Sequence, residues 1–170
     1  MESVRVQLSG NRIKAAGRII GGECSEHPAF SASYDLVTDE NGITRRLSLR
    51  TSLAGGEKQA SVSRDAEGYW IIESANHQRS TYHGALDVDV VFSPFFNTLP
   101  IRRLGLHTDS ADVQVPVVYV NLLDLSIREA ELTYSSGSDG IHVISPVSTS
   151  SVTVDADGFV VDYPGLAERI

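Results

Sequence analysis

The stretch "SPFFNTLPIRRLGL", residues 93–106, interrupts a chain that otherwise alternates apolar and polar residues. Ser93 followed by Pro94 predicts a helix start, because a hydroxyl N-cap is often followed by proline at the first helical position. Pro100 predicts a break, since proline disrupts a helix interior and pushes the preceding residue towards extended geometry. Gly105 then predicts a left-handed helix end. We expect a short, broken helix whose apolar side chains are buried under a sheet.

The segments on either side of this helix have the pattern of strands. They alternate apolar and polar residues, or they are rich in aromatic and β-branched side chains. The sequence "LSIREAELTY" fits either a strand or a helix. The predicted strands are residues 4–8, 30–37, 43–50, 59–64, 69–73, 86–92, 115–120 and 159–163.

Turn signals separate these strands. The sequences "TDENGIT", "RDAEGYW" and "DADGFVV" each place aspartate shortly before a glycine, and a strand-like run follows. Because glycine supplies the positive φ that tight turns need, we expect hairpin corners at Gly42, Gly68 and Gly158, with a fourth at Gly140. Turns this regular predict an antiparallel meander that curls into a barrel, roll or sandwich.

Length and charge limit the classes of protein that the chain can be. A chain of 170 residues suits a single domain over residues 1–170. A net charge of -8 argues against nucleic acid as a partner and against electrostatic docking on an anionic membrane. Residues 1–170 contain neither an apolar secretory segment nor a run long enough to span a bilayer. We therefore expect no transmembrane segment and a cytoplasmic location.

The motifs that usually mark catalysis are missing from the sequence. It has no glycine-rich phosphate loop, no dinucleotide fingerprint and no nucleophile elbow. The five histidines lack the spacing of metal ligands, and Cys24 is the single cysteine. We expect no cofactor, no metal and no catalytic residue.

A group of charged residues lies within and just before the predicted helix. Asp87 and Asp89 share one face of a strand, about 6.5–7 Å apart. Arg102 or Arg103 is placed in sequence to meet them if the helix is buried, and Asn97 adds an amide. These five residues form either a recognition site for a sugar or phosphate headgroup or an internal ion-pair network that fixes the helix. A glycosidase pair is a poor fit, because two carboxyls on one strand rarely straddle a sugar.

A set of large apolar side chains also has two interpretations. The set could line a cavity for an acyl chain, or it could form a packed core, which uses the same residue types. Its members are Trp70, Phe92, Phe95, Phe96 and Leu99.

Two motifs carry a resemblance to a known family. The sequences "DVDVVFSPFFNTLPIRRLGL" and "VTVDADGFVVDYPGLAERI" resemble signatures of a bacterial family named for glycolipid binding. The resemblance implies a spiral β-roll, an antiparallel sheet wound as an incomplete barrel around one short helix. It also implies a partial likeness to periplasmic lipoprotein carriers, which hold acyl chains inside such a barrel.

Three functions remain open from the sequence. The first is a non-enzymatic protein that holds a lipid or glycolipid in an apolar interior, with Asp87, Asp89, Asn97 and Arg102 at its polar end. The second is a structural or interaction protein with a solid core, acting as a homodimer. The third, an enzyme that modifies a sugar or lipid, has no supporting group of residues.

Overall fold

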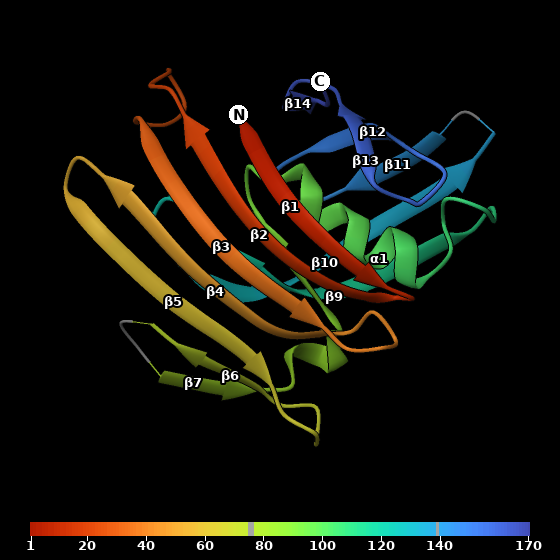
Figure 1. The fold of residues 1–170 in the computed structure, drawn as a ribbon, viewed down its shortest axis with the longest axis horizontal. Helices are drawn as coiled ribbons and strands as arrows, with labels where there is room; N and C mark the ends of the chain where they lie inside the picture. Colours follow the sequence, from red (N-terminus) through yellow and green to blue (C-terminus); the bar gives the residue numbers. More distant parts are fainter. Residues whose placement is uncertain (75–76, 139) are drawn as a thin grey trace.

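The structure, a computed structural model, describes residues 1–74, 77–138 and 140–170. Its first half is a seven-stranded antiparallel meander in which each strand pairs with its sequence neighbours. The sheet curls into a half-barrel (Figure 1). Its strands are β1 (Glu2–Ser9), β2 (Arg12–Gly21), β3 (Phe30–Thr38), β4 (Thr44–Leu53), β5 (Gly56–Arg64), β6 (Trp70–Glu73) and β7 (His77–Ser80).

The second half forms another seven-stranded sheet, ordered from β14 down to β8. Strand β8 pairs with β9 in parallel because the helical segment and a loop lie between them in the chain. The ambiguous segment "LSIREAELTY" contributes to strand β10. The strands are β8 (Asp87–Val90), β9 (Asp112–Val120), β10 (Ile127–Gly137), β11 (Gly140–Ile144), β12 (Thr149–Val154), β13 (Val160–Tyr163) and β14 (Ala167–Glu168).

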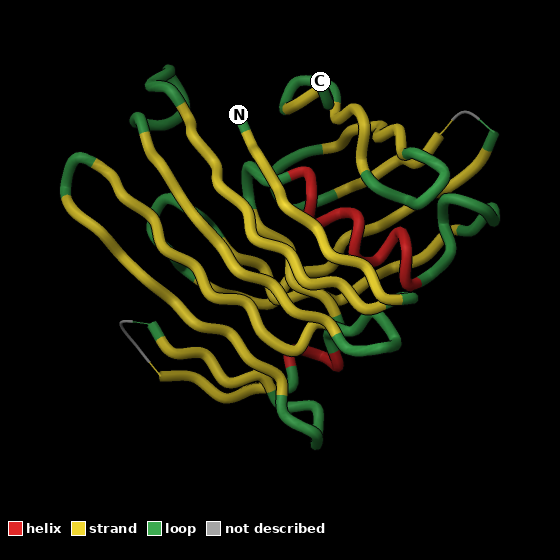
Figure 2. Tube along the Cα trace, viewed as in Figure 1, coloured by secondary structure: helices red, strands yellow, loops and turns green. Residues whose placement is uncertain are grey.

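The helical segment lies between the two sheets (Figure 2). A 3-10 turn, η2 (Pro94–Asn97), continues directly into α1 (Thr98–Arg103), and a second 3-10 turn, η1 (Tyr82–Gly84), precedes β8. Gly105 has a φ of 68°, which confirms the predicted helix end. The predicted break at Pro100 is wrong. Pro100 falls in the first turn of α1, where the backbone N–H has no intrahelical acceptor to lose, so the helix continues through it.

Ser93 is the N-cap residue of η2, but its hydroxyl makes no capping bond. It donates instead to Glu2 Oε1 at 2.6 Å, and Tyr34 Oη donates to the same oxygen at 2.8 Å. Burial raises the pKa of Glu2, although these donors offset part of the rise. This contact joins the first strand to the start of the helical segment, 91 residues away in sequence.

Strand β2 escaped the sequence prediction because its inward positions include small residues. Ala15 and Gly17 face the core together with Ile13 and Ile19, which weakens the apolar alternation. Gly17 pairs with Tyr34 on β3, and a Cβ at Gly17 would lie 2.1 Å from the Cζ of Tyr34. The tyrosine ring therefore covers the glycine, which no larger residue can replace without moving that ring.

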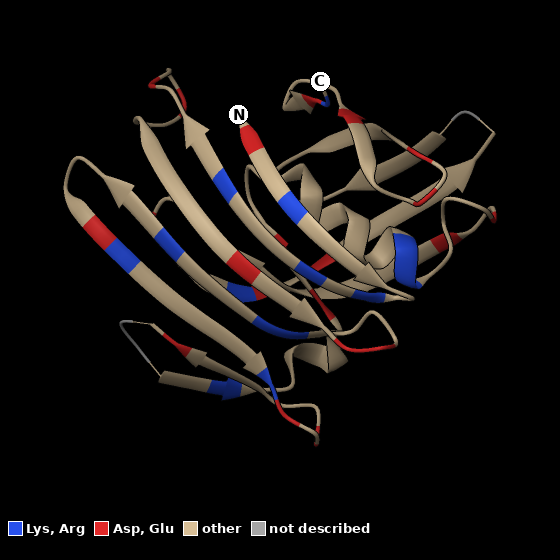
Figure 3. Cartoon of the chain, viewed as in Figure 1, with Lys and Arg blue, Asp and Glu red and all other residues tan. Residues whose placement is uncertain are grey.

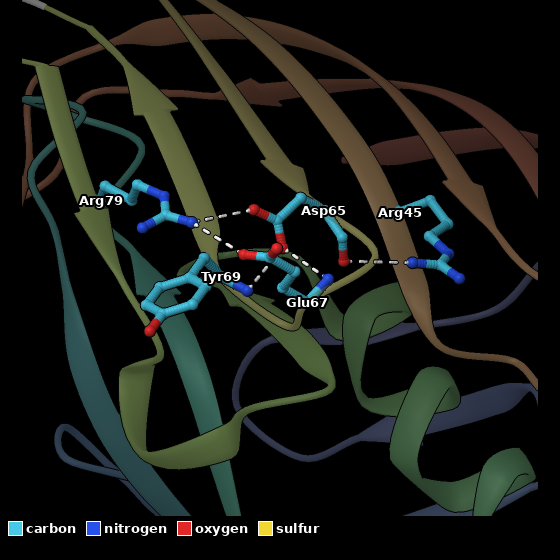
Figure 4. A network of polar contacts seen from close by, with 5 residues as sticks. All are labelled: Arg45, Asp65, Glu67, Tyr69 and Arg79. Carbon is cyan, nitrogen blue, oxygen red and sulfur yellow. Dashed lines mark hydrogen bonds and ion pairs between the residues drawn. The ribbon is translucent and has the colours of Figure 1, made fainter.

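Three turns share one geometry. Asp39, Asp65 and Asp155 each use Oδ1 to accept backbone N–H groups two and four residues ahead, and each uses Oδ2 to contact an arginine. In the second turn, the Tyr69 N–H and Arg79 hold the pKa of Asp65 below its ordinary value (Figure 4). The positive φ values confirm the corners predicted at Gly42, Gly68, Gly158 and Gly140 (80°, 89°, 79° and 117°), although Asp139 beside the last lies outside the described residues.

The core has two parts, one on each side of the helical segment. Phe95, Phe96 and Leu99 pack with the inward side chains of the first sheet, and Ile101 packs with the second sheet. Trp70 is fully buried and its indole N–H donates to the Ala85 carbonyl at 2.9 Å. The predicted fold is confirmed: a mainly β roll wound around one short buried helix. No helix in the described part of the chain is long and apolar enough to cross a membrane.

Candidate functional site

Strand β8 presents its two aspartates towards the helical segment. Asp87 pairs with Val117 and Asp89 pairs with Tyr119 on the neighbouring strand, and both partners belong to the core of the second sheet. Val88, between the aspartates, packs with the first sheet. The alternation of β8 therefore places two carboxyl groups inside the protein on one face, where each requires a partner.

Asp87 has its partner. Its Oδ2 lies 2.6 Å from Nη2 of Arg103 and 3.2 Å from Nε, so the guanidinium forms a fork on the carboxylate. The Asp87 side chain is fully buried, and burial raises its pKa while Arg103 offsets part of that rise. This ion pair ties the end of α1 to β8 and leaves neither group free for a ligand.

Asp89 has no such partner. It makes no ion pair within the described residues, and burial raises the pKa of its carboxyl to about 7. The side chain lines a cavity of about 240 Å³. A buried carboxyl that faces a cavity without a cation is a typical feature of a binding site.

A tyrosine on the neighbouring strand adds a buried hydroxyl without a hydrogen-bond partner. Tyr119 lines the same cavity, and its hydroxyl is buried without a hydrogen-bond partner. Burial, and then the charge of Asp89, raise the pKa of Tyr119 to about 12, so the hydroxyl keeps its proton. The guanidinium of Arg128 lies 4.7 Å from the ring centroid of Tyr119. The cavity thus offers a carboxyl whose raised pKa only the backbone N–H of Val90 offsets, and a hydroxyl without a hydrogen-bond partner in the described chain.

The cavity combines several polar groups with an apolar lining. Tyr163 Oη lies 3.2 Å from Ser148 Oγ, and both residues line the cavity. Asn97 also lines it and accepts a hydrogen bond of 2.9 Å from Tyr134 Oη. Val147 and Leu166 line the cavity as well, yet 67% and 41% of their surface is exposed.

Phe92 lines this cavity with a strained backbone. Its φ is 71°, a value that bulky residues rarely adopt outside functional or tightly constrained positions. Its ring contacts those of His27 and Phe30 at centroid distances of 5.0 and 5.5 Å. The positive φ turns the chain between β8 and η2, and Phe92 itself forms part of the cavity wall.

The structure separates the residues that the sequence grouped together. Asp89, Asn97 and Phe92 line the cavity, whereas Asp87 and Arg103 pair beside the helix. Arg102 points elsewhere: it donates to the Asp157 carbonyl, and its guanidinium lies 4.9 Å from the ring centroid of Phe159. The remaining members of the apolar set lie in the core with the first sheet, so a ligand role for them stays a prediction: Trp70, Phe95, Phe96 and Leu99.

Sequence reasoning missed Tyr119, Ser148 and Leu166. Strand pairing and the turns at residues 145–148 and 163–166 bring them to Asp89 from distant parts of the chain. The signal that could have found Tyr119 is its place within "VPVVYV", where a polar hydroxyl follows a nearly continuous apolar run. Within the described residues, no group of three or more His, Cys, Asp and Glu side chains could hold a metal ion.

A second hollow, of about 660 Å³, lies on the outward face of β3, β4, β5 and β6. Its lining includes Asp35, Arg50 and Gln59, which are all exposed to solvent. Water satisfies such exposed groups, so they differ from the buried hydroxyl of Tyr119 in the cavity at Asp89.

The fold and the cavity define a class of protein: a mainly β roll wound around one short helix, with a small, partly buried cavity at Asp89. The chain belongs to the family described as "Putative glycolipid-binding", whose model matches residues 1–169. A crystal structure of a DUF1089 family protein from Pseudomonas aeruginosa has the same fold, with a TM-score of 0.78. The two chains are 24% identical, and the match covers 99% of this chain and 92% of the other. No curated protein matches the chain.

Proposed function

We propose that the protein is a non-enzymatic binding protein for a glycolipid or similar amphiphile, and that the ligand's sugar headgroup occupies the cavity at Asp89. The observation that carries this proposal is the meeting of two buried groups in the cavity, the Asp89 carboxyl without a cation and the Tyr119 hydroxyl without a hydrogen-bond partner. A sugar hydroxyl both donates and accepts hydrogen bonds, so a single ligand group can satisfy both.

The size of the cavity favours a headgroup over an acyl chain. Pockets that enclose whole drug-sized ligands measure about 300–1,000 Å³, whereas this cavity measures about 240 Å³. Trp70, Phe96 and Leu99 are almost fully buried in one packed cluster, so they fill the space that an interior acyl chain would need. The alkyl part of the ligand therefore lies outside the cavity.

The apolar lining suits this orientation. Val147 and Leu166 line the cavity with exposed apolar surface, which is where an alkyl chain would leave a buried headgroup. Covering such surface contributes about 25 cal/mol per Å² of apolar area. Buried polar groups at Asp89 and Tyr119, with exposed apolar side chains beside them, suit an amphiphile bound headgroup first.

The near-neutral pKa of Asp89 favours an uncharged headgroup. A carboxyl with a pKa of about 7 exchanges its proton near neutral pH and pairs well with hydroxyl groups. The family description supports a binding role and names no catalysis. The geometry agrees, because Asp87 is held by Arg103 and cannot act with Asp89 across a sugar.

Calorimetric titration with octyl glucoside below its micelle concentration tests this function. We expect saturable binding by the native protein, weaker binding by glucose, which lacks the alkyl chain, and at least a tenfold loss in Asp89→Asn. Asp112→Asn is the matched control, because Asp112 is exposed on β9 away from the cavity. Equal affinity in Asp89→Asn and the native protein would contradict the proposal. The proposal would also fail if neither octyl glucoside nor alkyl glycosides with other sugar headgroups bound.

A further inference from the structure

The outward face of the first sheet concentrates positive charge. Strand alternation points apolar residues of β1 to β4 inward and leaves five cationic side chains exposed on the other side. Figure 3 shows these residues recurring along β1, β2 and β4. We call this surface the basic face, and its residues are Arg5, Lys14, Arg18, Arg46 and Arg50.

The strand register places these cations close together. Arg18 and Arg50 both pair with Ser33, one from each side, and Lys14 and Arg46 both pair with Val37. Neighbouring strands lie about 4.8 Å apart, so each such pair of backbone positions is separated by about 10 Å. The outward positions of β1 to β4 hold one carboxylate, Asp35. None of the five cations forms an ion pair within the described chain.

The excess of negative charge comes from the second half of the chain, where residues 81–170 hold twelve Asp and Glu against four Lys and Arg. Asp112, Glu129 and Glu131 are exposed on β9 and β10 of the second sheet. Layers of sheet pack about 10 Å apart, and here a helix lies between them. These carboxylates are exposed to solvent, where salt screens charges that lie farther apart than the Debye length of about 8 Å, so they weaken attraction at the basic face less than a carboxylate on that face would.

We propose that the basic face docks the protein on an anionic lipid bilayer. The face is a broad sheet surface, and Ile20, 60% exposed, lies on it two residues beyond Arg18. The outward positions of β1 to β4 include no aromatic residue, which binding of single-stranded nucleic acid uses for base stacking. The face also lacks a protruding helix or ribbon that would enter a DNA groove.

Vesicle sedimentation tests this proposal with the full chain. The probes are vesicles of equal parts phosphatidylcholine and phosphatidylglycerol, vesicles of phosphatidylcholine alone, and duplex DNA. At about 0.1 M ionic strength we expect the protein to sediment with the anionic vesicles only, and at about 1 M to be released from them. The triple variant Lys14→Gln, Arg18→Gln, Arg50→Gln should bind roughly 100-fold more weakly, since each lost cation costs about fivefold.

A second triple variant is the matched control. Lys58→Gln, Arg128→Gln, Arg169→Gln removes the same charge from positions outside the basic face and should keep at least a third of the native vesicle affinity. Equal losses in the two triple variants, no sedimentation with anionic vesicles, or tighter binding to DNA would each overturn the proposal. Asp89→Asn leaves the basic face intact and should bind vesicles as the native protein does, so this test and the glycoside titration can fail separately.

Discussion

Nη2 of Arg103, in the last turn of α1, lies 2.6 Å from Oδ2 of Asp87 on β8, and the Asp87 side chain is fully buried. This contact holds the helical segment against the parallel strand pair in the middle of the roll. Removing the cation alone would leave a buried carboxylate without compensation, which is far more costly than removing both charges.

Arg103→Met should therefore lower the free energy of unfolding by about 3–5 kcal/mol. The double variant Asp87→Asn, Arg103→Met should recover much of this loss, because no charge remains buried. Arg102→Met is the control from the next position: its guanidinium contacts Phe159 and a carbonyl oxygen, and its loss should cost about 1 kcal/mol. Urea denaturation measures the free energy of unfolding of the two single variants and the double variant. A cost for Arg103→Met no larger than that for Arg102→Met would show that the ion pair does not hold the helix.

Asp89 should make stability depend on pH. The pKa of its carboxyl is about 7 in the folded protein and about 3.9 in an unfolded chain, so the fold favours the protonated form. This stabilisation is complete below pH 4 and is lost as pH rises through 7, a change of about 4 kcal/mol. Asp89→Asn stays neutral, so it should match the native protein at pH 4 and exceed its stability at pH 8. Parallel stability–pH curves for the two proteins would refute this assignment.

Gly17 should tolerate no side chain. A methyl group at this position would overlap the ring of Tyr34 and displace the hydroxyl that donates to Glu2. Gly17→Ala should lower the free energy of unfolding by about 1–3 kcal/mol, the usual cost of overpacking. Gly22→Ala is the matched control, since a Cβ there meets no atom within 4 Å, and it should change stability by less than about 0.5 kcal/mol. A lower melting temperature for Gly22→Ala than for Gly17→Ala would disprove the contact.

The aspartate turns should depend on Oδ1 more than on charge. Asp155 Oδ1 accepts the N–H groups of Asp157 and Phe159, while Oδ2 contacts Arg169 at 2.6 Å. Asp155→Asn keeps the Oδ1 acceptor and should cost less than about 1 kcal/mol, whereas Asp155→Ala removes both bonds and should cost about 1–2 kcal/mol. Guanidinium denaturation measures the free energy of unfolding of both variants. Equal costs would indicate that the arginine contact, and not the turn geometry, carries the stabilisation.

The sequence predicted the parts of the fold that depend on local chemistry. Alternating residues marked most strands, and the glycines at 42, 68 and 158 marked the corners, because the side-chain period and the positive φ are local properties. Strand β2 was missed where Gly17 and Ala15 replace larger inward residues. The predicted break at Pro100 was wrong. The 3-10 turn η2 precedes α1, so Pro100 lies in the first turn of the helix, and the sequence alone does not show this turn.

The site was less accessible to prediction. Asp87 and an arginine were expected to pair, but Arg102 and Arg103 are adjacent, and only the docked helix decides which one faces β8. The cavity joins Asp89 to Tyr119 and Ser148, which strand pairing and a distant turn bring together. Net charge also does not say where on the surface the charges lie. It sums the basic face and the acidic second sheet, which the fold places apart.

The central claim is that Asp89 and Tyr119 receive a ligand headgroup, and a crystal structure of the native protein soaked with octyl glucoside tests it most directly. The account predicts the glucose ring in the cavity, with hydroxyl groups within hydrogen-bond distance of the Asp89 carboxyl and the Tyr119 hydroxyl and the alkyl chain over Val147 and Leu166. A glycoside bound with its alkyl chain among Trp70, Phe96 and Leu99, or bound only outside the Asp89 cavity, would contradict it.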